Sequence, residues 1–185
     1  MKFKRTHLAV GAAVLLVGVG SGVAVAVNAT SSPSMVVSAV DNYAGSANSE
    51  VTAAASRMGM SLTSGSRATL VASVAGEKVY LVKDGDDRLC VIRVSSEQNA
   101  GSCGSRSQLL STGVYLITGR PGDFSAIVVT PDGISSASVS DGASKASNNV
   151  AILKLDGSDS GLVLTGVDGT RHSIDLGALM PPPLK

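Results

Sequence analysis

The stretch "KVYLVKDGDDRLCVIRVS", residues 78–95, indicates the fold class of this chain. It contains two apolar runs rich in β-branched residues, 78–83 and 88–95, on either side of a polar segment that begins with Asp84-Gly85. Val, Ile and Tyr are enriched in strands, whereas Asp-Gly pairs favour hairpin turns because glycine adopts a positive φ at low cost. The stretch therefore predicts two strands joined by a turn.

The alternation of short apolar runs and turn residues continues through the rest of the chain. Nine segments are predicted to be strands: 69–75, 78–83, 88–95, 113–119, 124–130, 134–140, 149–155, 161–165 and 171–176. Short strands separated by Asp-Gly turns are typical of antiparallel sheets. We therefore expect a mainly β fold, either an antiparallel β-sandwich or a partly open barrel.

One short α-helix is expected before the strands. The segment "SANSEVTAAASRMGM", residues 46–60, offers Asn48 or Ser49 as an N-cap, Glu50 in the first turn and Gly59 as a stop. Asn and Ser are preferred N-caps because their side chains accept hydrogen bonds from the unpaired N–H groups of the first turn.

Residues 1–29 are typical of an export segment. A short basic start is followed by an uncharged apolar run at 8–27, and about 20 such residues are long enough to cross the hydrocarbon layer of a membrane. Small residues before the Ala29–Thr30 bond also favour cleavage after Ala29. A cleaved signal peptide and a membrane-anchoring helix both remain open, and in either case the rest of the chain is expected outside the cytoplasm.

The remaining chain divides into three parts. A Ser-, Ala- and Asn-rich linker is predicted at 30–48, a β domain with its leading helix at 49–178, and a Pro-rich tail at 179–185. The only membrane contact that the sequence predicts is through residues 8–27, if they are not removed.

The charge balance gives no sign of a nucleic-acid partner. The chain has 15 Lys and Arg and 14 Asp and Glu. Three of the basic residues and none of the acids lie in the export segment, which leaves 12 basic and 14 acidic residues and a net charge of about −2. Nucleic-acid binding depends on clustered Lys and Arg that displace counterions, so none is expected.

Two cysteines, Cys90 and Cys103, could be metal ligands, a redox pair or a disulfide. A structural zinc site takes four ligands, and His172 is the only histidine after the export segment. Redox pairs usually have the spacing Cys-x-x-Cys, which is absent here. Because an exported protein reaches a compartment where disulfides persist, we predict a structural disulfide, with Cys90 in a strand and Cys103 in a Gly-Ser turn.

The sequence nominates no catalytic, cofactor-binding or metal-binding residue. The segment "GSDSG", residues 157–161, is similar to the Gly-Asp-Ser-Gly of chymotrypsin-like proteases, but its residue order differs and His172 follows it instead of preceding it. The cluster Asp84, Asp86 and Asp87 could bind calcium weakly, but it lacks the ligand spacing of an EF-hand loop and is expected to form a turn.

The order of several motifs resembles a group of uncharacterised exported proteins of actinobacterial type. These motifs are "KVYLVKDGDDRLCVIRV", the second cysteine, "VVTPDGISSASVSDG" and "VLTGVDGTRHSIDL", and the resemblance covers residues 65–176. It implies a β domain stapled by a disulfide, of unknown activity. Because these motifs are structural, no catalytic residue is carried over.

We therefore expect a non-enzymatic β domain outside the cytoplasm, secreted or tethered to the membrane. Its role is expected to be the binding of an unidentified protein or a component of the cell envelope, through loops and strand edges carried on a rigid scaffold. The alternative is a small secreted hydrolase with an unrecognised Ser/His or carboxylate site, which would require ionisable groups to converge in a cleft.

The intact mass of the protein recovered from membrane and medium fractions tests the export and disulfide predictions. We expect a chain that begins at Thr30 and weighs two hydrogens less than the same chain after reduction. A mass that includes residues 1–27 would identify a membrane anchor, and an unchanged mass after reduction would exclude the disulfide.

Overall fold

The computed structural model describes residues 35–43, 45–74, 76–120, 123–156, 159 and 161–176. The predicted export segment and the predicted Pro-rich tail lie outside these residues. Within the described part of the chain, no helix has the length and apolar character needed to cross a membrane.

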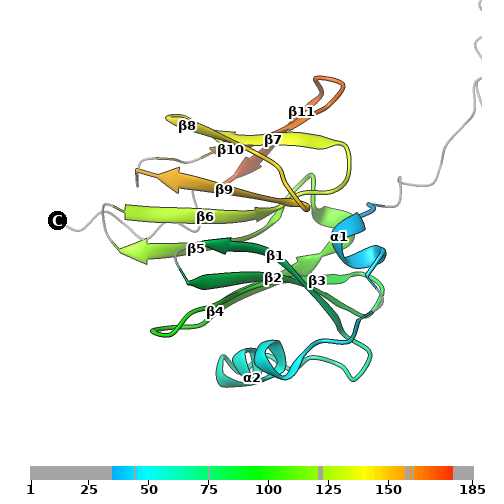
Figure 1. Ribbon diagram of the computed structural model, residues 1–185. Helices are drawn as coiled ribbons and strands as arrows, with labels where there is room; N and C mark the ends of the chain where they lie inside the picture. The colour runs from blue at the N-terminus through cyan, green and yellow to red at the C-terminus, as the bar shows by residue number, and fades with distance from the viewer. Residues whose placement is uncertain are drawn as a thin grey trace, which may run out of the picture. The chain divides into compact units, whose positions relative to one another are not determined.

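The described chain is mainly antiparallel β, as the sequence predicts (Figure 1). The elements are α1 (Ser38–Asp41), α2 (Ser49–Arg57), β1 (Arg67–Val74), β2 (Glu77–Asp84), β3 (Arg88–Val94), β4 (Ala100–Ser105), the 3-10 helix η1 (Arg106–Gln108), β5 (Val114–Arg120), β6 (Asp123–Val129), β7 (Ile134–Val139), β8 (Gly142–Lys145), β9 (Val150–Leu155), β10 (Gly161–Gly166) and β11 (Arg171–Asp175). They form three open sheets: sheet A in the order β1-β2-β3-β4, sheet B in the order β5-β6-β9, and sheet C in the order β11-β10-β7-β8.

All nine predicted strands are present, but the structure adds two that the sequence did not reveal. These are β4, with the sequence AGSCGS, and β8, with the sequence GASK. Gly, Ser and Ala have low β-propensity, so these strands exist because their backbones pair with β3 and β7. The prediction that Cys103 lies in a Gly-Ser turn is therefore wrong, since Cys103 lies within β4.

Sheet B is the middle layer and is covered on both faces (Figure 1). Core 1 packs sheet A against one face through residues such as Leu81, Leu89 and Val129. Core 2 packs sheet C against the other face through residues such as Leu153 and Leu164. Strand β6 accordingly ends in four consecutive buried residues, "AIVV", because a strand buried on both faces has no polar face to alternate with.

Helix α2 covers the outer face of sheet A. Val51 and Ala54 of the helix pack with Tyr80 and other sheet residues in core 3. The Asn48 side chain accepts a hydrogen bond from the Val51 N–H at 2.9 Å, which confirms Asn48 as the N-cap. The Tyr80 hydroxyl donates to Glu50 at 2.6 Å and joins the first turn of the helix to β2.

Part of the predicted linker at 30–48 is packed on the domain. Val37 and Val40 are fully buried in core 1. Arg106 donates two hydrogen bonds to the Asp41 carboxylate, at 2.6 and 2.9 Å, and thereby holds α1 in place. A helix of four residues is too short to produce a readable apolar period, so the sequence indicated at most one short helical turn at 35–40 within a tether, and not its burial.

Burial raises the pKa of Asp41, but the hydrogen bonds from Arg106 and from the Val37 N–H outweigh it and hold the value at about 2. A carboxylate with a lowered pKa stabilises the fold above its unfolded-state pKa, and this contribution is lost as the pH falls through the folded-state value.

We expect Asp41→Asn to lower the free energy of unfolding by about 2 kcal/mol at pH 7. The difference from the unmodified protein should shrink as the pH falls from 4 to 2, because the native carboxyl is then protonated as well. Urea unfolding at each pH measures this, with Asp86→Asn, on an exposed turn, as the control. A difference that stays constant across this pH range would contradict the assignment.

Candidate functional site

The two cysteines form a disulfide between neighbouring strands. Cys90 of β3 and Cys103 of β4 are direct partners in the antiparallel register, and their sulfur atoms are 2.06 Å apart. Cys90 is fully buried in core 3, whereas Cys103 is half-buried. The structure confirms the predicted pairing, and the bond joins edge strand β4 to the interior of sheet A.

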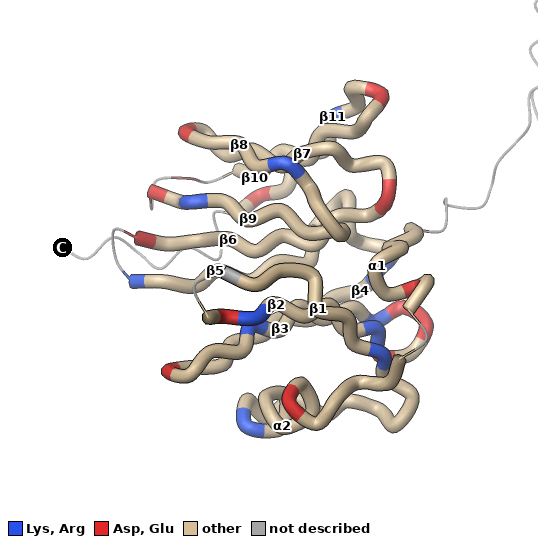
Figure 2. Tube along the Cα trace, viewed as in Figure 1, with Lys and Arg blue, Asp and Glu red and all other residues tan. Residues whose placement is uncertain are grey.

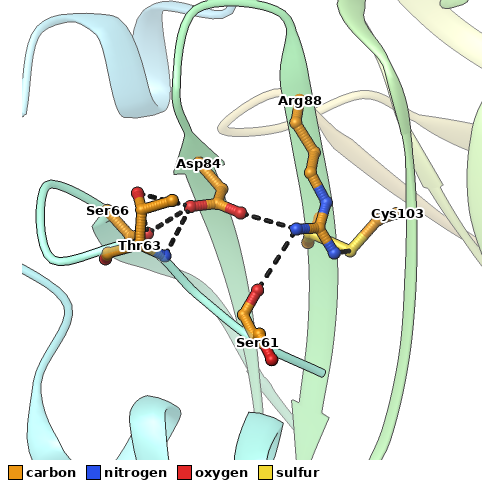
Figure 3. Close-up of a disulfide and its surroundings, with 7 residues drawn as sticks. Ser61, Thr63, Ser66, Asp84, Arg88 and Cys103 are labelled. Atoms are coloured by element: carbon orange, nitrogen blue, oxygen red, sulfur yellow. Dashed lines mark hydrogen bonds and ion pairs between the residues drawn. A yellow bond between two sulfur atoms is a disulfide. The ribbon is translucent and has the colours of Figure 1, made fainter. Parts of the chain in front are cut away.

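A buried carboxylate lies beside the disulfide (Figure 3). The Asp84 side chain is 1 % exposed and forms an ion pair with Arg88 at 2.7 Å. Thr63 and Ser66 also donate to it, at distances of 2.6 to 2.8 Å. Burial raises the pKa of Asp84, but these hydrogen bonds outweigh it and lower the pKa.

Arg88 links this carboxylate to the disulfide. Its guanidinium also donates to the Ser61 carbonyl at 3.2 Å and lies 3.5 Å from the Cys103 sulfur. Because these contacts join residues 61–66 to Asp84 of β2 and Arg88 of β3, this cluster holds the segment between α2 and β1 on sheet A. We therefore assign it a structural role.

Two of the three acidic residues considered for calcium, Asp84 and Asp87, form hydrogen bonds within the fold. Asp84 points back to the segment before β1, whereas Asp87 accepts hydrogen bonds from the Ser105 hydroxyl and from the Ser107 N–H. In the part of the chain that the structure describes, no group of three or more His, Cys, Asp or Glu residues could hold a metal ion.

The structure does not bring together the residues considered for a serine hydrolase. Asp159 is buried and accepts a hydrogen bond from the Ser140 N–H at 3.1 Å. His172 is paired with Leu164, about 10 Å along β10 from Gly161, and Asp159 lies two residues before Gly161 in the chain. The serines of "GSDSG" lie outside the described residues.

One carboxyl pair was not foreseen from the sequence. Asp141, in the β7–β8 turn, is hydrogen-bonded to Asp156, at the end of β9, and this hydrogen bond raises the pKa of Asp141. Glycosidases need their two carboxyl groups at least about 5 Å apart to leave room for the sugar. A directly hydrogen-bonded pair is closer than that, so the pair does not fit this chemistry.

A groove lies where an edge of each sheet meets the others, and it is the best candidate for a binding site. One half has a volume of about 570 Å³. Its walls come from β4, the turn before β5, β5 itself and β11, and they comprise Ser102, Cys103, residues 111–117 and Asp175. The wall is therefore a mixture of apolar side chains and neutral hydroxyl groups, with the disulfide on one side.

The other half of the groove continues along the same strand. It has a volume of about 600 Å³ and is lined by Glu77, Arg93, Ser95, Glu97, Gln98, Ala100, residues 117–120 and Asp123. Ile117 lines both hollows, and together they line every residue of β5. We call the two hollows together the β4–β5 groove.

The loop closed by the disulfide forms one wall of the β4–β5 groove. Ser95 and Gln98 exchange two hydrogen bonds of 2.7 and 3.0 Å across this loop. The loop therefore has a defined turn, and both of its flanking strands belong to sheet A.

Three of the strands that border the groove, β4, β5 and β11, are edge strands. Among the described residues, β4 pairs only with β3, β5 only with β6, and β11 only with β10. The sheets approach closely at one end, where a Cβ on Gly104 would lie 2.7 Å from the Val114 side chain. An edge strand presents backbone N–H and C=O groups that another strand can pair with.

Two ionisable residues lie side by side in the apolar half. Tyr115 of β5 and Asp175 of β11 both line it. Burial raises the pKa of Tyr115, and the negative charge of Asp175 raises it further. The Tyr115 hydroxyl therefore stays protonated at neutral pH and can donate a hydrogen bond into the groove.

Charges on the rest of the surface are mixed in sign. In Figure 2 the acidic and basic residues lie mostly at turns and strand ends, with both signs interspersed. Among the described residues, the surface therefore gives no electrostatic reason to expect a polyanion as the partner.

Comparisons with known proteins add no identification. No family model matches the chain, and neither a curated protein nor a solved structure matches it. The resemblance to exported actinobacterial-type proteins therefore stays a prediction.

We expect Cys90→Ala/Cys103→Ala to lower the free energy of unfolding by about 3 kcal/mol, because the bond closes a loop of 13 residues' separation and restricts the unfolded chain. Urea unfolding of both proteins, with and without a thiol reductant, measures this. Reductant should destabilise only the unmodified protein. Equal stability of the two proteins without reductant would show that the disulfide contributes little.

Proposed function

We propose that this protein is a non-enzymatic binding domain outside the cytoplasm that receives an extended polypeptide in the β4–β5 groove. The export segment predicted from the sequence and the Cys90–Cys103 disulfide both support the location. The observation that carries the binding role is that two neighbouring hollows, which share Ile117, together line the whole of edge strand β5.

An extended polypeptide fits this groove better than a compact small molecule. Strand β5 has seven residues, and at 3.3 Å per residue it offers an edge of about 23 Å. A peptide added to such an edge gains main-chain hydrogen bonds along its length, and pockets for alternate side chains give it specificity.

The two halves of the groove favour different side chains. Val114, Leu116 and Tyr115 make one half mainly apolar. The other half carries both signs of charge, including Arg120 and Glu97. We infer that the partner is a peptide with apolar side chains at one end of its bound segment and polar or charged side chains at the other.

The scaffold is best described as a sandwich of three sheets, an inference supported by the separate cores on the two faces of sheet B. In that arrangement an edge of each sheet lies at the same side of the domain and remains accessible. The groove therefore follows from the layering, and no special loop is required to build it.

Binding is preferred over a hydrolase of the Ser/His type because His172 lies outside the β4–β5 groove. His172 lines a different hollow, with Asp132 and Asp168, whereas the β4–β5 groove contains Tyr115 and Asp175 in its apolar half. A hydrolase of the Ser/His type needs its nucleophile and base within hydrogen-bond reach of each other.

Ile117→Asp tests the groove, because it places a carboxylate where the two halves meet. Octapeptides selected from a random phage-displayed library on the full exported chain would be resynthesised with a fluorescent label, and their Kd measured by fluorescence anisotropy. We expect the substitution to raise the Kd at least about tenfold, because binding would bury an unpaired charge.

Ile152→Asp is the matched control. Ile152 is 37 % exposed and lies on β9, at the opposite edge of the same sheet, so its replacement should leave the Kd within about twofold. Thermal unfolding of both variants checks that they fold. The proposal is wrong if no octapeptide binds the unmodified chain, or if both substitutions weaken binding equally.

A further inference from the structure

We propose that the resident occupant of the β4–β5 groove is the chain's own C-terminal segment, residues 177–185, so that an outside peptide must displace it. This inference rests on the proposed function, since it assumes that the groove accepts an extended polypeptide. It adds a regulatory step, in which the site is closed until a better ligand competes.

The place where the described chain ends supports this occupant. Asp175 of β11 lines the apolar half of the groove, and Leu176 is fully buried in core 2. The described chain therefore ends next to β5, and no long connection is needed to bring the segment to the groove.

The direction of β11 points the segment along β5. The Ile174 side chain lies within 3.0 Å of the position of a Cβ on Gly113, just before β5. One residue later, Asp175 lines the same hollow as Tyr115, and its negative charge raises the pKa of the Tyr115 hydroxyl. Residue numbers therefore increase in the same direction along β11 and β5, so the two strands run parallel. Their arrows in Figure 1 point toward the same side.

The length and composition of the segment fit the remaining edge. Gly177-Ala178-Leu179-Met180 would extend over about 13 Å, which matches the four residues of β5 from Ile117 to Arg120, also about 13 Å at the same rise. All four residues keep a backbone N–H that can pair with an edge. The three prolines that follow, residues 181–183, lack this donor and would end the pairing.

The double substitution Leu179→Asp/Met180→Asp in the full exported chain tests the proposal. It places two charges in the part of the segment assigned to β5 but changes no described residue. Hydrogen exchange of the amides at 114–120 and the Kd of a selected octapeptide would be measured on the same samples. The matched control is Leu184→Asp, which lies after the prolines.

We expect faster exchange at 114–120 and about a tenfold lower octapeptide Kd in the double variant, because a groove that is nine-tenths occupied lowers the apparent affinity tenfold. Leu184→Asp should change neither quantity. Exchange that slows as the protein concentration rises would show that the segment comes from a second copy, which overturns the intramolecular form.

The two proposals fail in different ways. If octapeptides bind but the double variant changes neither exchange nor Kd, the segment is not the occupant and the groove proposal stands. If the double variant speeds exchange but no octapeptide binds either chain, the segment occupies the groove and the proposed binding function is wrong. If neither effect is seen, both are wrong.

Discussion

The burial of sheet B on both faces is the constraint on which the rest of the structure depends. Core 1 and core 2 share this sheet, so loss of packing on either face would expose a strand such as β6, whose last four residues are all buried. An apolar run of that kind has no polar face that could be exposed to solvent. The sheet therefore requires a cover on each side, and sheets A and C provide it.

Three stacked open sheets leave strand edges that no other strand pairs with among the described residues. A closed barrel would pair every strand on both sides, whereas three open sheets leave β4, β5 and β11 with unpaired edges near one another. The disulfide bond fixes one of these, because Cys103 of β4 is bound to the buried Cys90 of β3. A rigid wall of this kind favours binding, because a preorganised groove loses less conformational entropy when a ligand binds.

Buried and half-buried carboxylates attach the remaining segments to the sheets. Asp84 holds the segment before β1, Asp41 binds Arg106 to hold α1, and Glu50 accepts from Tyr80 to hold α2. Each of these acids is surrounded by donors from the chain itself. Their lowered pKa values therefore reflect structural roles and do not mark a reactive site.

The sequence by itself determined the mainly β class, the nine apolar strands, the Asn48 cap and the cysteine pair, because each is encoded by residues that lie close together in the chain. It did not reveal β4, whose Gly and Ser residues become a strand only by pairing with β3, nor the burial of Val37 and Val40. The candidate groove was equally invisible. Its walls come from residues 77 to 175, and only the tertiary structure decides which strand edges meet, because stacking of sheets is set by packing between distant segments and leaves no local pattern.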